Sequence, residues 1–246
     1  MPGIAITNTM ITMWLVMAIL ISLALIVRLT MKFLPTGFQN VVEWALGGMR
    51  NVMENVGGKQ AQKHFPIFIT FFLTILFSNW LGIIMGMLAE ESGVLRAPTS
   101  DLNTTIALAL VAFFYFEYQG AKAHGLFGHL GHFFNFKALF SNGLMGILDF
   151  LVGLLHIVSE IVRPTALALR LFGNIFGGEI VLTVVFLLVG PLMPVPFMGF
   201  EVLIGLIQAF VFSMLFLVFT SLNTAHDDSH DHEEKQSHGA VPVAAH

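Results

Sequence analysis

The chain has 246 residues, of which 56% are hydrophobic and only 11% are charged. In soluble globular domains about a quarter of the residues are charged, so this composition excludes a soluble globular protein and indicates an integral membrane protein. The formal net charge is -4 and there is no cysteine, which excludes disulfides and thiolate metal sites.

Five apolar stretches are predicted to cross the membrane as helices, which gives an all-α integral membrane protein. A helix rises 1.5 Å per residue and needs about 20 residues to cross the hydrocarbon core. The predicted crossings are residues 5–27, residues 65–88, residues 102–118, a long segment that ends at residue 190, and residues 197–222. The last two are longer than the core is thick, so they are expected to be strongly tilted.

Residues 34–53 depart from this apolar pattern. Their apolar side chains recur at helical spacing: Val42, Ala45, Leu46, Met49 and Met53. Glu43 and Arg50 share another face, and Trp44 suits an interfacial position. The pattern predicts an amphipathic helix on the membrane surface, with an ordinary helix of a soluble domain as the alternative.

The basic residues lie almost entirely on one side of the predicted crossings. They are Arg28, Lys32, Arg50, Lys59, Lys63, Lys122, Lys137, Arg163 and Lys235. By the positive-inside rule that side is cytoplasmic, or its organellar equivalent, which puts the N-terminus outside. The polar C-terminal tail, residues 223–246, is then inside and is predicted to be disordered, beyond a membrane domain of residues 1–222.

Histidines occur in two polar segments that could bind a metal. His124, His129 and His132 lie in a Gly- and Phe-rich loop without a nearby acid or thiolate, and the tail histidines stand among aspartates and glutamates. Solvated segments are the preferred interpretation, so we predict neither a metal site nor a cofactor. A membrane-bound metalloprotein that uses its His-rich tail is an alternative, and it predicts stoichiometric zinc binding.

Several acidic residues approach the predicted crossings. Glu117 lies near the end of the third crossing and is predicted to be interfacial. Residues 143–160 have a helical pattern with Asp149, His156 and Glu160, and they are predicted to be an interfacial segment that leads into the next helix.

Arg170 is the most unusual residue of the chain. It lies in residues 164–190, where Glu179 is the only other charge. An arginine at the bilayer centre costs about 2.5–3.5 kcal/mol on insertion scales, so charged groups there usually belong to an ion pathway or a buried pair. The alternative is an arginine near a helix end that extends to the interface.

The last two crossings are predicted to form an antiparallel hairpin whose polar residues face one another. Arg170 falls opposite Gln208 and Glu179 opposite Glu201, to within about one helical turn, and Asn174 lies one turn after Arg170. Two neighbouring carboxylates repel when both are ionised, so Glu179 and Glu201 could bind and release protons as a relay. Two unrelated interfacial acids are the alternative.

Four segments resemble subunit a of the F-type ATP synthase membrane sector. They are RPTALALRLFGNIFGGE (163–179), APTSDLNTTIALAL (97–110), IQAFVF (207–212) and LPTGFQNVVE (34–43). The resemblance covers most of the chain except the tail, and LRLFGN is its most specific motif. It implies a proton-translocating stator subunit without a catalytic site of its own, in a bacterial inner membrane or an organellar energy-transducing membrane.

The resemblance also implies roles for individual residues. Arg170 matches the essential arginine that faces the rotating c-ring, whose carboxylates exchange protons through two half-channels. Asn174, Glu179, Glu201 and Gln208 match polar positions along the proton path, where the family often has one acid and one histidine at the positions of 179 and 201.

The partners that the resemblance implies are the c-ring, the peripheral-stalk b subunits and the lipid bilayer, with no nucleic acid. A stand-alone channel or secondary transporter that uses the same polar residues is an alternative. It predicts ion flux in liposomes from this chain alone.

Overall fold

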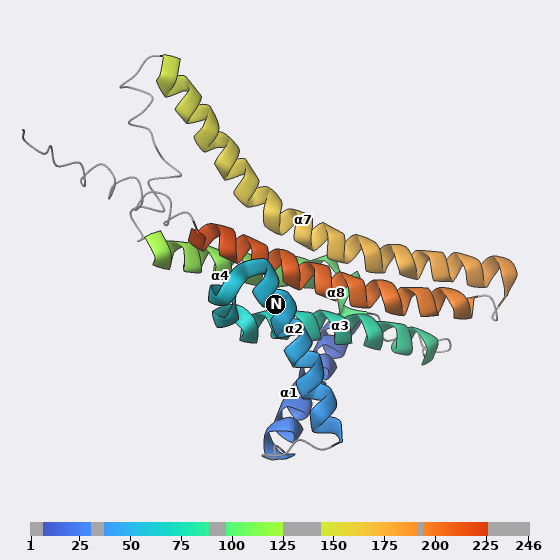
Figure 1. Cartoon of the computed structure of the whole chain (residues 1–246). Helices are drawn as coiled ribbons and strands as arrows, with labels where there is room; N and C mark the ends of the chain where they lie inside the picture. Colours follow the sequence, from blue (N-terminus) through green and yellow to red (C-terminus); the bar gives the residue numbers. More distant parts are fainter. Residues whose placement is uncertain (1–6, 31–36, 89–96, 125–143, 191–193, 226–246) are drawn as a thin grey trace, which may run out of the picture. The chain divides into compact units, whose positions relative to one another are not determined.

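A computed structural model describes residues 7–30, 37–88, 97–124, 144–190 and 194–225, and all regular structure in them is helical (Figure 1). The all-α prediction is confirmed for these residues. The helices are α1 (Asn8–Thr30), α2 (Phe38–Ala61), α3 (Phe65–Leu88), α4 (Leu102–His124), α7 (Leu144–Val189) and α8 (Pro194–Ala225), with short 3-10 turns at Gln62–His64 and Pro98–Ser100.

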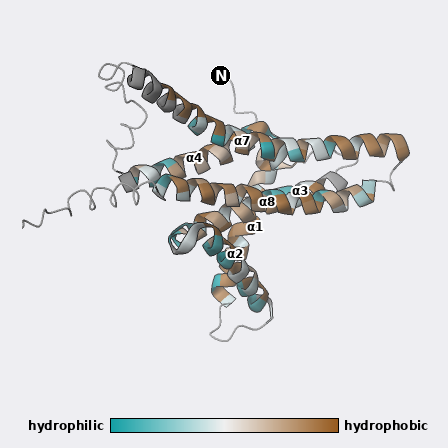
Figure 2. Cartoon of the chain, turned by 45° about the horizontal axis from the view of Figure 1, so that its top comes forward, coloured by the Kyte–Doolittle hydropathy of each residue, from teal (hydrophilic) through white to brown (hydrophobic). Residues whose placement is uncertain are grey.

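Four helical segments in the described part of the chain are long and apolar enough to cross a membrane. They are Asn8–Thr30, Gln62–Met85, Val158–Val189 and Pro194–Thr224. Figure 2 shows hydrophobic residues along most of α8 and the adjoining part of α7. The third predicted crossing forms helix α4 but does not meet the same criterion, because polar residues interrupt it: Asn103, Thr104, Thr105, Glu117 and Gln119.

The chain divides into two compact units. The first contains residues 1–110 and 164–217, and the second contains residues 111–163 and 218–246. α3 and α8 are antiparallel in the first unit, because positions early in α3 contact positions late in α8. Phe68 and Leu217 belong to one buried cluster, and the Phe71 ring lies 5.6 Å from Phe212 and 5.0 Å from Phe216.

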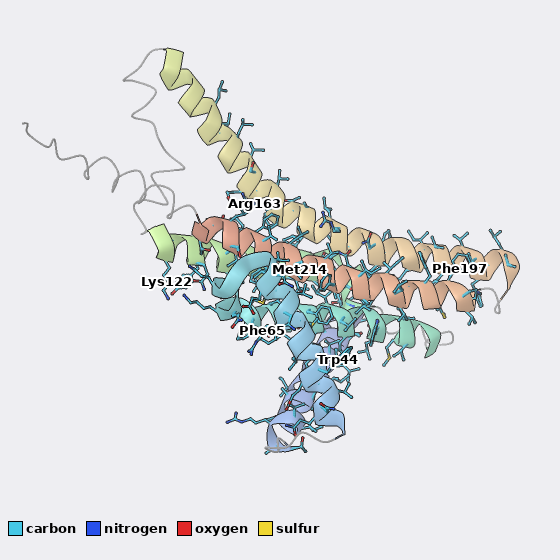
Figure 3. The ribbon with its side chains drawn as sticks, in the orientation of Figure 1. Trp44, Phe65, Lys122, Arg163, Phe197 and Met214 are labelled. Atoms are coloured by element: carbon cyan, nitrogen blue, oxygen red, sulfur yellow. The ribbon has the colours of Figure 1, made fainter. Side chains whose placement is uncertain are left out.

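α2 is the predicted amphipathic helix, and one of its faces packs against this cluster. Met53 and Ala61 are fully buried there, next to the partly buried Phe65 and Met214 (Figure 3). Trp44 is 80% exposed, and its interfacial position stays a prediction. Of the predicted apolar face, Met53 is buried and Val42, Leu46 and Met49 are partly buried, whereas Ala45 is exposed. A non-helical residue, Gly58, interrupts α2 before Ala61.

α7 is a single helix of 46 residues, and it includes both the predicted lead-in segment and the following crossing. Pro164 lies inside it, where the proline ring removes one backbone hydrogen bond without ending the helix. The helix ends at Gly190, whose φ of 97° favours glycine and whose N–H donates to the carbonyl of Phe186. The sequence pattern correctly predicted this end but suggested a boundary at Pro164 that α7 does not have.

Some predictions concern residues outside the described ranges. These are His129 and His132 of the predicted histidine loop, within residues 125–143, and the tail beyond Ala225. The prediction that His124 lies in that loop was wrong, because α4 continues through His124. The side chains of Asp149 and His156 also lie outside the described part. α8 itself continues through Ala225, past the predicted end at residue 222.

Candidate functional site

Arg170 lies on an exposed face of α7. The opposite side of the helix is packed, with Leu167, Leu171 and Ile175 buried. Helical spacing places Arg170 on the same face as Gly173 and Ile180, and all three are exposed. Arg170 makes no ion pair or hydrogen bond with the residues that the structure describes. It is therefore a permanent positive charge on an apolar surface that an external anion could approach.

Asn174 and Gln208 connect α7 to α8. The Asn174 Nδ2 donates a hydrogen bond of 2.6 Å to the Oε1 of Gln208, whose buried Nε2 has no partner among the described residues. The predicted register, with Arg170 opposite Gln208, is thus displaced by one helical turn. This displacement is within the one-turn range of the prediction, and α8 begins at Pro194, three residues before the predicted start at residue 197.

Glu179 and Glu201 lie close enough for their charges to interact, as predicted. Glu201 is 7% exposed, and its Oε2 has no hydrogen-bond partner in the described part of the chain. Its other oxygen, Oε1, lies against Gly178, where an added Cβ atom would be only 2.7 Å away. Gly178 therefore leaves the space that the Glu201 carboxyl group occupies.

A polar network around Asn79 was not predicted from the sequence. The Asn79 side chain is 1% exposed and donates from Nδ2 to the Gly205 carbonyl of α8 at 3.2 Å. Its Oδ1 accepts a hydrogen bond of 2.8 Å from the Thr99 hydroxyl. Trp80 donates from Nε1 to the Val202 carbonyl at 3.2 Å. The signal that could have identified the network is the polar triplet of residues 78–80 inside an otherwise apolar helix.

The segment before α4 is held by Asp101. Its Oδ1 accepts from the backbone N–H of Asn103 at 2.9 Å and its Oδ2 accepts from the Thr9 hydroxyl at 3.0 Å. The first contact caps the start of α4 and the second connects that start to α1. This part of the APTSDLN segment therefore has a structural explanation.

The second unit contains an acid–arginine cluster formed by Glu117, Glu160, Arg163 and Asn223. Arg163 donates to Glu160 at 2.5 Å and to Asn223 at 3.3 Å, and its guanidinium lies 5.3 Å from the centre of the Phe219 ring. Asn223 donates in turn to Glu117 at 3.3 Å. Glu117 is half-buried and bonded within this cluster, and its interfacial position stays a prediction.

Comparison with known proteins gives a consistent result. A family model described as "ATP synthase A chain" matches residues 10–221. A protein of Gloeobacter violaceus named "ATP synthase subunit a" is 38% identical, over 91% of this chain and 86% of its own length. A protein of the same name from Geobacter sulfurreducens is 37% identical, over 87% of this chain and 86% of its own length. Another from Nitratidesulfovibrio vulgaris is 40% identical, over 84% of this chain and 81% of its own length. The chain therefore belongs to the ATP synthase A chain family.

Proposed function

We propose that the chain is the proton-translocating stator subunit of a rotary ATP synthase, with Arg170 facing a ring of c subunits. The observation that carries the proposal is the exposed guanidinium of Arg170 on an apolar helix face, without a partner in the described chain. A charge in that setting is costly unless a partner supplies an anion. A carboxylate on a passing ring subunit is such an anion.

The proposed mechanism is electrostatic. A ring carboxylate beside Arg170 is favoured as the anion and releases its proton toward the cytoplasmic half-channel. At an effective dielectric constant near 20, a contact pair at about 4 Å has roughly 4 kcal/mol of Coulomb energy, part of which desolvation cancels. That energy favours deprotonation only while the carboxylate is near Arg170, and the arginine also blocks a direct leak between the half-channels.

Glu179 and Glu201 would line the inlet half-channel that returns a proton to the ring. Their proximity, and the lack of a hydrogen-bond partner at the buried Oε2 of Glu201, support this role, because such a group can bind an incoming proton. Asn174 and Gln208 would supply neutral hydrogen-bonding groups between this pair and Arg170. The relay would therefore run along the α7–α8 hairpin.

The proposal includes a topology and partners. We propose five crossings, with α4 as the third, strongly tilted α7 and α8 segments, an external N-terminus and a disordered tail in the cytoplasm. The membrane would be a bacterial inner membrane or an organellar equivalent, and the b subunits of the peripheral stalk would hold the chain against rotation. A crossing by α4 is feasible because helix packing can cover its polar residues.

The decisive experiment replaces Arg170 by alanine in the whole ATP synthase and measures proton-driven ATP synthesis in inverted vesicles. We expect coupled synthesis to be abolished while the complex assembles. Arg28→Ala is the matched control, because Arg28 is also exposed but lies in the last turn of α1. Coupled synthesis retained by Arg170→Ala would contradict the proposal, and ion flux through the purified chain alone would favour a stand-alone channel.

A further inference from the structure

Two backbone carbonyl groups of α8 accept hydrogen bonds from side chains of α3. These are the carbonyls of Val202 and Gly205, which bind Trp80 and Asn79. They are three residues apart and so lie on one side of α8, facing α3. Glu201 precedes the first and Gln208 follows the second by about one turn. The two bonds therefore hold the part of α8 that carries Glu201 and Gln208, the two residues that α8 contributes to the proposed proton path.

Both polar atoms of the Asn79 side chain are engaged in hydrogen bonds. Its amide donates to the Gly205 carbonyl, and its oxygen accepts from Thr99, which is fully buried. A helical carbonyl has two lone pairs, so Gly205 can accept from Asn79 in addition to its own helical bond. Asn79 thereby connects α3 to α8 and to the Pro98–Ser100 turn.

Glycines permit the close packing that these bonds require. A Cβ atom at residue 205 would lie 3.1 Å from the Cβ of Asn79, which is tighter than ordinary side-chain contact. At residue 82, an added Cβ would lie 2.3 Å from the Cβ of Ala97, at the start of the segment that carries Thr99. The backbones on both sides of Asn79 are thus held close to α3.

We infer that Asn79 is a positioning residue, which sets the rotation of α8 about its own axis and so places Glu201 and Gln208 for proton transfer. This inference rests on the proposed function. A rotation of about 20° moves an atom at the ~5 Å outer radius of a helix by nearly 2 Å. Such a movement is enough to break the 2.6 Å bond between Asn174 and Gln208.

The most specific test is Asn79→Asp, which keeps the size of the side chain. A protonated aspartic acid can donate to the Gly205 carbonyl, whereas an aspartate cannot and repels it. Residue 79 is 1% exposed, and burial favours the neutral form of a carboxyl group, so the introduced aspartic acid should stay protonated at about pH 5.5 and ionise by about pH 9. We expect ATP-driven proton pumping close to wild type at the lower pH and roughly five- to tenfold lower at the higher pH. Glu201 and Asp101 are the acids nearest in sequence to Gly205 and Thr99, and both are present in the variant and in the wild type. Dividing the pumping rate of the variant by that of the wild type at the same pH therefore cancels the effect of their titration.

The other half of the network provides a second pair of variants. Thr99→Val removes the hydroxyl that Asn79 accepts from at nearly constant volume, whereas Thr99→Ser keeps it. We expect lower pumping in the first and wild-type pumping in the second, which a purely steric role would not give. This pair keeps the test valid if Asn79→Asp fails to assemble. The control for added charge is Asn51→Asp, because Asn51 is exposed on α2.

A readout independent of transport measures the rotation itself. The chain has no cysteine, so Ile204→Cys on α8, at a half-buried position, can be labelled specifically with a small maleimide. The thiolate is the reacting form, so every labelling rate rises with pH, and the rate in the Asn79→Asp background is therefore divided by the rate with Asn79 at the same pH. This labelling ratio should change at least threefold between the same two pH values. A constant pumping ratio or a constant labelling ratio overturns the inference. Coupled transport by Arg170→Ala would instead overturn the proposed function, whatever Asn79 does.

Discussion

Two arginines on α7, two helical turns apart, differ in whether the described part of the chain supplies them with a partner. Arg163 is bonded to Glu160 and Asn223 and lies against the Phe219 ring. Arg170 is exposed and makes no such contact in the described part of the chain. An arginine whose charge is balanced within its own chain stabilises that chain, whereas one without a partner is available to a second molecule. The difference supports the proposed functional role of Arg170 and a structural role for Arg163.

The acidic residues show a similar difference. In the acid–arginine cluster, Glu117 accepts a hydrogen bond from the Asn223 amide, and Glu160 accepts one from the positively charged Arg163. On the hairpin, the Oε2 of Glu201 and the Nε2 of Gln208 are buried and have no hydrogen-bond partner among the described residues. Buried polar groups are nearly always satisfied, so the exceptions require an explanation. Under the proposed function, that explanation is transient occupation by a proton or a proton-carrying water.

The largest expected effect comes from exchanging the two arginines for glutamine. Arg170→Gln should abolish proton-coupled ATP synthesis, because glutamine has similar hydrogen-bonding groups but no charge. Arg163→Gln should lower the amount of assembled enzyme while leaving the synthesis rate per assembled complex within about twofold. Both quantities can be measured in inverted vesicles with quantified complex. Equal losses per complex in the two variants would remove the distinction between them.

The next effect concerns the space beside Glu201. Gly178→Ala places a methyl group 2.7 Å from the Glu201 Oε1 and should displace the carboxyl group, which lowers the pumping rate by roughly tenfold. Gly177→Ala is a matched control, because nothing lies within 4 Å of a Cβ atom there. Similar rates in the two variants would show that the position of the Glu201 carboxyl group is not limiting.

A smaller effect is expected on stability from the acid–arginine cluster. Arg163→Met removes the hydrogen bonds to Glu160 and Asn223 and leaves the buried carboxylate without its cation. We expect the free energy of unfolding to fall by about 1–3 kcal/mol, because the Arg163 side chain is 22% exposed and part of the interaction is screened. Thermal unfolding in mild detergent, with Arg28→Met as the exposed control, measures this loss. An unchanged midpoint would mean that the cluster does not stabilise the chain.

The smallest expected effect is the coupling between Asn174 and Gln208. A double-mutant cycle with Asn174→Ala and Gln208→Ala should give about 0.5–1.5 kcal/mol in stability, the usual range for a single neutral hydrogen bond. Strictly additive losses would indicate that the 2.6 Å contact contributes nothing.

The sequence predicted the parts of the molecule that depend on local pattern. Long apolar runs predicted the helices, and the isolated charge of Arg170 predicted a functional residue, which stays a prediction until the variants are measured. The hairpin register was displaced by one turn because the Pro-rich segment does not reveal which of its residues form the turn. Polar residues shortened the apolar run of α4, so its crossing remains a proposal.

Contacts between distant segments could not be predicted. Asn79 and Gly205 are separated by 126 positions, and Glu117 and Asn223 by 106. A polar residue in an apolar helix indicates that some partner exists, because a buried amide or carboxylate without one is unfavourable. It does not indicate which helix supplies the partner, since that depends on packing and crossing geometry.

The most direct test of the central claim is to identify what lies against the Arg170 face in the intact enzyme. Because the chain has no cysteine, Gly173→Cys introduces a unique thiol on that face, where nothing lies within 4 Å of an added Cβ atom. A photoactivatable maleimide crosslinker attached there should give a product with a c subunit, and the same reagent on Trp14→Cys of α1 should not. A product from residue 173 with lipid alone, or with a subunit outside the ring, would contradict the account.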